Sequence, residues 1–136
     1  MRSEVELRIP PETFAPTLAR AAIGAVGSGL PDSVSSDAEL LTTEVVSNAV
    51  RHTQPDPSHA IVLRVVLDGN LRVEVTDPGP PFEITTRGPA ERASGWGLFL
   101  LDAIATSWGV EPEGAGKTVW FELGAPHTEG LATPVS

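Results

Sequence analysis

Two periodicities of apolar and polar residues run along the chain, and each predicts one type of secondary structure. Alternation and β-branched residues are typical of strands, and they predict strands over residues 5–9, 61–67, 71–76, 108–111 and 118–123. Apolar residues three to four positions apart are typical of amphipathic helices, and they predict helices over residues 11–26, 33–52 and 97–106. The expected order is therefore a strand, two helices, two strands, a helix and two strands.

Each predicted helix has one apolar stripe that we expect to be buried. The first helix should bury Phe14, Leu18, Ala21 and Ala22. The second helix has the strongest pattern, and Asp32 or Ser33 is its expected N-cap. It should bury Leu40, Leu41, Val45, Val46 and Ala49. The third helix should bury Leu98, Leu101 and either Ile104 or Ala105.

The connections between strands and the order of elements predict the fold class. Asp68-Gly69-Asn70 predicts one hairpin turn, and residues 114–116 predict a second. Helices do not alternate with strands one for one, so a doubly wound parallel sheet is not expected. The expected fold is α/β, in the form of an α+β two-layer sandwich. A mixed, mostly antiparallel sheet would have three helices on one face. We expect one domain over residues 1–124 and a disordered tail over 125–136.

Composition narrows the class of protein. The chain has 136 residues, 40% of them hydrophobic, which is enough for one core. Cysteine is absent, so disulfides and thiol chemistry are excluded. No apolar run approaches the ~20 residues that cross a bilayer, and no signal segment is recognisable. We therefore expect a soluble, cytoplasmic protein without membrane contact. The net charge of -9 argues against direct nucleic-acid binding.

The second predicted helix places a carboxylate and a carboxamide one turn apart, at Glu44 and Asn48. An Asn oxygen is a hard, neutral ligand that suits Mg²⁺. The Glu44 carboxylate could orient or deprotonate a hydroxyl that attacks a γ-phosphate. On spacing alone, a solvated helix face is the more common origin of such a pattern.

Three later segments add candidate binding groups. Asp77 ends an apolar strand, where it could accept the amino hydrogen of adenine while Gly79 lets the backbone approach the ring. Gly95 and Gly97 precede the third helix and could admit phosphates to its free N–H groups. Thr118 could hydrogen-bond toward Asp77 and the base. The alternatives are a plain Asp-Pro turn, a flexible entry loop and an ordinary strand threonine.

Other common sites are not indicated. The three histidines, His52, His59 and His127, do not have the spacing of a metal site, and no Ser/His/Asp arrangement stands out. The chain also lacks the glycine-rich Gly-Lys-Ser/Thr loop of P-loop enzymes.

In this order the motifs resemble the GHKL (Bergerat-fold) ATPase superfamily, and within it the short bacterial anti-sigma-factor serine/threonine kinases. The resemblance covers roughly residues 5–123. It implies an α/β sandwich in which ATP lies between the helix layer and a mobile lid at about residues 80–94. By resemblance, Glu44 is the catalytic general base, Asn48 the Mg²⁺ ligand and Asp77 the adenine-reading residue.

The resemblance also implies the phosphate-binding residues and the partners. Gly95 and Gly97 would admit the phosphates, and Leu98 would be a further cofactor-binding residue. Arg87 and Arg92 would be lid residues that contact the phosphates. ATP and Mg²⁺ are the implied cofactors. The implied substrate is a serine or threonine of a STAS-type anti-anti-sigma protein, and the implied regulated partner is a sigma factor. The oligomeric state stays open, with a homodimer as one candidate.

One position departs from the family pattern and keeps alternatives open. The first glycine box normally ends in a second glycine, and this chain has Pro81 there. Proline fixes φ and lacks an N–H, so it stiffens the lid hinge and removes one donor. The alternative to a kinase is therefore a nucleotide-binding partner-switching module with weak or no catalysis. A third interpretation is the detached catalytic domain of a histidine kinase.

Overall fold

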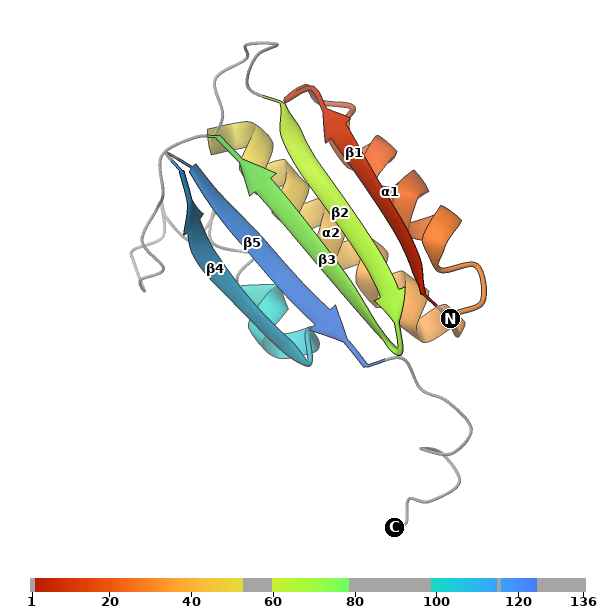
Figure 1. Ribbon diagram of the computed structural model, residues 1–136. Coiled ribbons are helices and arrows are strands. Elements are labelled where there is room, and N and C mark those ends of the chain that lie inside the picture. Colours follow the sequence, from red (N-terminus) through yellow and green to blue (C-terminus); the bar gives the residue numbers. More distant parts are fainter. Residues whose placement is uncertain (1, 53–59, 79–98, 115, 125–136) are drawn as a thin grey trace.

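The computed structural model describes residues 2–52, 60–78, 99–114 and 116–124, which form one sheet with helices on one face (Figure 1). In chain order the first half has β1 (Ser3–Ile9), α1 (Ala15–Val26) and α2 (Asp32–His52). The second half has β2 (Ile61–Asp68), β3 (Asn70–Asp77), a helical segment at 99–104, β4 (Ser107–Glu113) and β5 (Gly116–Leu123). The predicted two-layer α+β fold is confirmed.

The sheet has the strand order β1-β2-β3-β5-β4, and every pair of neighbouring strands is antiparallel. The described sheet is therefore more uniform than the mixed sheet that the sequence predicts. Both predicted hairpins are confirmed, and each turn contains a glycine with positive φ, Gly69 at 82° and Gly114 at 60°. Only glycine adopts such angles at little cost, which explains why these two positions fix the strand register.

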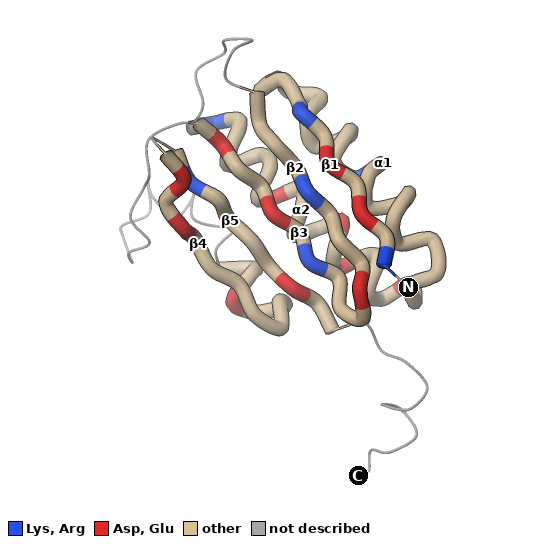
Figure 2. The backbone as a smooth tube through the Cα atoms, viewed as in Figure 1, with Lys and Arg blue, Asp and Glu red and all other residues tan. Residues whose placement is uncertain are grey.

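The two faces of the sheet differ in polarity because side chains alternate along each strand. One face packs against the helices, with α1 against β1 and β2 and with α2 against β3 and β5. Its fully buried residues include Leu63, Val65, Val73, Val75 and Phe121. The other face is polar, and acidic and basic positions alternate across β1, β2 and β3 (Figure 2). A buried site would therefore lie on the face of the sheet that the helices cover.

The buried stripe of α1 is rotated from the predicted one. The helix buries Ala15, Ala19, Ala22, Ile23 and Val26. Phe14 is 49% exposed and Leu18 is 41% exposed, and Ala21 is exposed as well. The small alanines face inward because they let α1 lie close to α2 and the sheet, so residue size outweighed hydrophobicity in choosing the face.

In α2 most of the predicted stripe is buried, and Leu40 is the exception at 41% exposure. The buried positions Ala38, Leu41, Val45 and Ala49 recur every three to four residues, which turns the neighbouring Leu40 away from the core. In the third helix Leu101 is fully buried, and Ile104 and Ala105 are partly buried against the core. Leu98 lies outside the described residues.

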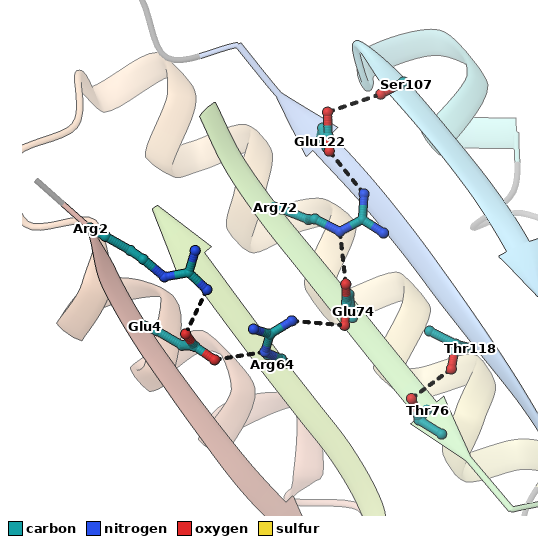
Figure 3. Close-up of polar contacts among 9 residues, drawn as sticks. All are labelled: Arg2, Glu4, Arg64, Arg72, Glu74, Thr76, Ser107, Thr118 and Glu122. Atoms are coloured by element: carbon teal, nitrogen blue, oxygen red, sulfur yellow. Dashed lines mark hydrogen bonds and ion pairs between the residues drawn. The ribbon is translucent and has the colours of Figure 1, made fainter. Parts of the chain in front are cut away.

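The polar face has a row of ion pairs, which we call the charge row (Figure 3). Its members are Arg2, Glu4, Arg64, Glu74, Arg72 and Glu122. Arg64 Nε lies 2.7 Å from a Glu4 oxygen, and the Arg64 hydrogen bond, assisted by Arg2, lowers the pKa of Glu4. These side chains are partly exposed, so the charge row aligns the strands more than it stabilises them.

The lowered pKa gives the charge row a pH dependence. The folded chain holds Glu4 ionised below the ordinary pKa of glutamate, about 4.3. The stabilisation is therefore present above that pH and is lost as the pH falls through the lowered value. We expect Glu4→Gln to reduce the unfolding free energy slightly at pH 7 and to have no effect at about pH 2. Denaturant unfolding at both pH values measures this, with Glu12→Gln as an exposed control outside the row. An equal loss at both pH values would contradict the prediction.

Among the described residues, no helix has both the length and the hydropathy that crossing a membrane requires.

Candidate functional site

The first part of the candidate site lies on α2. Asn48 is 7% exposed and Glu44, one turn earlier, is partly buried. Residues four apart on a helix share a face, and here that face borders the buried stripe that contains Val45 and Ala49. The two polar groups are therefore at the margin of the core rather than on a fully solvated face. This burial favours a functional role for Glu44 and Asn48 over the alternative of a solvated helix face.

The Asn48 carboxamide oxygen already accepts a hydrogen bond from a cationic group. Arg51, one turn further along α2, donates from Nη2 to Asn48 Oδ1. The oxygen is therefore oriented so that a positive group can reach it. Mg²⁺ in nucleotide sites takes one or two protein oxygens and completes its shell with phosphates and water. Among the described residues no cluster of three or more His, Asp or Glu side chains forms an all-protein metal site. A single Asn oxygen fits the nucleotide-linked mode of binding.

The second part of the site lies at the end of β3, where two opposite charges are buried together. Asp77 is 1% exposed and Lys117 on β5 is 2% exposed. The two residues are directly opposite each other in the strand register, and Lys117 Nζ lies 2.8 Å from Asp77 Oδ2. A buried charge is costly unless a partner compensates it. The pairing explains how a carboxylate can end an apolar strand inside the protein.

The two parts lie at the same end of the molecule. The C-terminal end of α2 lies over the sheet near the end of β3 and the start of β5 (Figure 1). Asn48 is in the last turns of α2, and Asp77 and Lys117 are at those strand ends. The Asn48 carboxamide and the Asp77 carboxylate are thus placed on the helix side of the sheet, at the end where β3 ends and β5 begins.

Thr118 points the other way, which corrects the prediction that it hydrogen-bonds toward Asp77. Its hydroxyl lies 2.7 Å from that of Thr76 on the polar face of the sheet (Figure 3). Alternation along β5 places Thr118 opposite in direction to Lys117, so Lys117 makes the contact with Asp77. The signal was present in the sequence, because Lys117 shares its parity with the apolar positions Val119 and Phe121.

The remaining candidate residues lie outside the described residues. These are Gly79, Arg87, Arg92, Gly95, Gly97 and Leu98, together with Pro81 and the rest of the expected lid. Their roles at the phosphates stay predictions.

Gly116 is the tightest backbone position next to Asp77. A Cβ atom there would overlap the carbonyl oxygen of Asp77 and lie 2.8 Å from Cα of Pro78. Both neighbours are backbone, so no side-chain rotation can relieve the overlap. The glycine therefore sets how closely β5 approaches the end of β3.

We expect Gly116→Ala to lower the unfolding free energy by roughly 1–3 kcal/mol, the usual cost of overpacking. The matched control is Gly24→Ala in α1, where an added Cβ meets nothing within 4 Å. That control should raise stability by roughly 0.5–1 kcal/mol, because alanine is the better helix former. Thermal and denaturant unfolding of both variants measure the contrast. Equal stability of Gly116→Ala and the parent chain would contradict the packing argument.

Comparison with known proteins places this geometry in a family. Residues 10–123 match the histidine kinase-like ATPase domain family. The chain is 37% identical over 97 residues to an uncharacterized protein of Streptomyces coelicolor, covering 69% of this chain and 92% of that protein. It is 26% identical over 120 residues to the serine-protein kinase RsbW of Listeria monocytogenes, covering 76% of each.

A solved structure has the same fold. The crystal structure of the RsbU and RsbW domains of a Mycobacterium tuberculosis protein is similar with a TM-score of 0.72 at 21% identity. The match covers 93% of this chain and 33% of that one, so the chain spans about a third of that structure. At this identity the likeness shows the fold alone.

An antiparallel sheet covered on one face by helices agrees with the fold of an ATPase domain. The chain belongs to the histidine kinase-like ATPase domain family, to which residues 10–123 match. The predicted resemblance to the GHKL superfamily and its anti-sigma-factor kinase type is thereby confirmed, with the RsbW serine-protein kinases among the relatives. Membership of an ATPase family implies that the chain binds ATP.

Proposed function

We propose that the chain is an ATP-binding regulatory serine/threonine protein kinase. Its substrate would be a serine or threonine of a STAS-type anti-anti-sigma protein, and it would hold a sigma factor as an anti-sigma factor. The observation that supports this best is the grouping of Glu44, Asn48 and Asp77. All three are buried or half-buried, and they lie on the elements that meet at one end of the sheet. Similarity to the RsbW serine-protein kinases supports the same class of reaction.

Each residue has a distinct role in the proposal. Asp77 accepts a hydrogen bond from the amino group of adenine and fixes the base. The Asn48 oxygen would hold Mg²⁺, which when bound neutralises charge on the phosphates and orients them. Glu44 accepts the proton of the substrate hydroxyl as that oxygen bonds to the γ-phosphorus and the bond to the ADP oxygen breaks.

Arg51 adds a consequence of the geometry. In the structure its guanidinium donates to the same Asn48 oxygen that would hold the metal. A Mg²⁺ ion on that oxygen would repel the Arg51 guanidinium, so we expect Arg51 to move away when the metal binds. The exposed Arg51 side chain can move without disturbing the core, since it extends from the surface of α2.

The direct test is transfer of phosphate between purified proteins. The chain is incubated with Mg·ATP and a STAS-type protein encoded beside its gene, and the product is analysed for phosphoserine and phosphothreonine. We expect stoichiometric transfer to one hydroxyl residue of the partner. The matched control is the same partner with that residue changed to alanine. Binding of ATP without transfer to any STAS-type protein would contradict the kinase proposal.

The second candidate is a nucleotide-binding partner-switching module without phosphate transfer. Pro81 favours it, because proline removes an N–H and stiffens the segment that the family uses as a lid hinge. The two candidates differ in one variant. Pro81→Gly should restore transfer if the proline alone blocks it, and it should leave the wild-type rate nearly unchanged if the kinase is already active.

The proposal also covers the localisation, the partners and the oligomeric state of the protein. We place it in the cytoplasm, where ATP and sigma factors are found. The net charge of -9 suits partners with basic patches and does not suit direct contact with nucleic acid. A homodimer is one candidate assembly, and sedimentation of the purified chain with and without ATP would determine it.

A further inference from the structure

The ion pair between Asp77 and Lys117 is buried at the end of β3, next to the proposed base-binding position. Among the described residues, the buried polar or charged side chains are Thr42, Asn48, Asp77 and Lys117. Two of these four are the members of one ion pair, and one member is the residue proposed to read the base. Whatever fixes the orientation of the Asp77 carboxylate should therefore also affect which base the proposed site recognises.

The position of Lys117 is set by the backbone and by packing. It lies opposite Asp77 in the β3–β5 register, and its ammonium is 2.8 Å from Asp77 Oδ2. The preceding residue, Gly116, lies so close to the Asp77 carbonyl that no side chain fits between the strands. The ammonium and the carboxylate are both about 2% exposed, so solvent does little to screen them. The pair is therefore fixed rather than one of several surface arrangements.

The chemical consequence concerns hydrogen-bond acceptors. An ionised carboxylate has two oxygens with about four acceptor positions, so it can accept from an ammonium and from an amino group together. The hydrogen bond from the Lys117 ammonium to Asp77 Oδ2 fixes the plane of the carboxylate, and it therefore also fixes the direction in which the other acceptor positions of the carboxylate point.

From these contacts we propose that Lys117 is a positioning residue for purine selection: by pairing with Oδ2, it holds Asp77 as a correctly oriented acceptor for the 6-amino group. This rests on the proposed function, in which Asp77 reads adenine. Lys117 does not need to touch the nucleotide. It acts through Asp77, and its removal should change which purine is preferred rather than how tightly every triphosphate binds.

The experiment compares two nucleotides that differ only at the 6-position. Dissociation constants for ATP and for purine ribonucleoside 5′-triphosphate, which lacks the amino group, are measured by calorimetry in magnesium buffer. In the parent chain ATP should bind roughly ten- to hundredfold more tightly, the value of one hydrogen bond to a charged group. In Lys117→Met that ratio should fall to within about threefold of unity. Lys117→Arg, which keeps the positive charge, should restore most of the ratio.

Folding controls keep the outcome clear. Circular dichroism and the melting temperature show which variants are folded at the assay temperature. If Lys117→Met does not fold, Lys117→Gln replaces it, and its ratio should lie between unity and the parent value, since its amide keeps a donor but not the charge. Arg64→Met, on the polar face and away from Asp77, is the matched control and should leave the ratio unchanged.

The possible outcomes distinguish a failure of the inference about Lys117 from a failure of the proposed function. A folded Lys117→Met that binds both nucleotides more weakly but keeps the parent ratio would overturn the inference, because a purely structural role predicts that result. A parent chain that binds both nucleotides with the same affinity would show that the 6-amino group is not read at all. A parent chain that binds neither would refute the proposed function itself, and the inference with it.

Discussion

Replacing Glu44 by alanine is expected to reduce phosphate transfer to the partner protein by roughly 10²–10⁴-fold, the usual contribution of a general base. Glu44 is at the margin of the core on α2, one turn from the proposed magnesium ligand Asn48. Its carboxylate is not among the fully buried groups, so its loss should leave the fold and ATP affinity nearly unchanged. The effect belongs to the chemical step, and a lower rate with an unchanged nucleotide dissociation constant is the expected signature.

The measurement is single-turnover transfer from labelled ATP, combined with calorimetry of ATP binding. Glu39→Ala is the matched control, because Glu39 is a partly buried acidic residue on the same helix whose side chain has no proposed role. Glu44→Gln separates basicity from shape, since glutamine has nearly the same volume but cannot accept the proton. Retention of more than about a tenth of the parent rate by Glu44→Ala would show that another group activates the hydroxyl.

The general fold could be predicted from the sequence because its signals are local. Asp68-Gly69-Asn70 and the glycines at 114 and 116 specify hairpin turns, and alternation specifies which strand residues face the helices. The exposed side of a helix was harder to predict. Phe14 and Leu18 are apolar but exposed, because packing of α1 favours small residues whose contribution depends on distant neighbours.

In the candidate site too, local sequence signals could be read directly, but contacts between distant segments could not. Helical spacing made Glu44 and Asn48 candidates, and the structure adds the burial that spacing cannot supply. Asp77 was identified from its place at a strand end, yet its partner is Lys117 rather than Thr118. That partner depends on pairing between strands about 40 residues apart in sequence, and hydrophobic pattern alone does not reveal such a long-range register.

The buried pair itself leads to the second large prediction, which concerns stability. Removing one member takes the ion-pair partner away from a charge that stays buried, so Lys117→Met and Asp77→Asn should each lower the unfolding free energy by about 3–5 kcal/mol. That is a large part of the 5–15 kcal/mol typical of a domain, and the melting temperature should fall by on the order of 10 °C.

The double variant Asp77→Asn/Lys117→Met should lose much less than the sum of the two single losses, because neither charge is then buried without its ion-pair partner. Denaturant unfolding of the parent and the three variants forms a complete double-mutant cycle. Arg64→Met is the control for an exposed ion pair, at 35% side-chain exposure against 2% for Lys117, and its effect should be small. If the two single losses simply add in the double variant, the ion pair does not couple the strands, and burial of each side chain alone must account for the stability. A large positive coupling would instead show that each of the two buried side chains depends on the other for its contribution to stability.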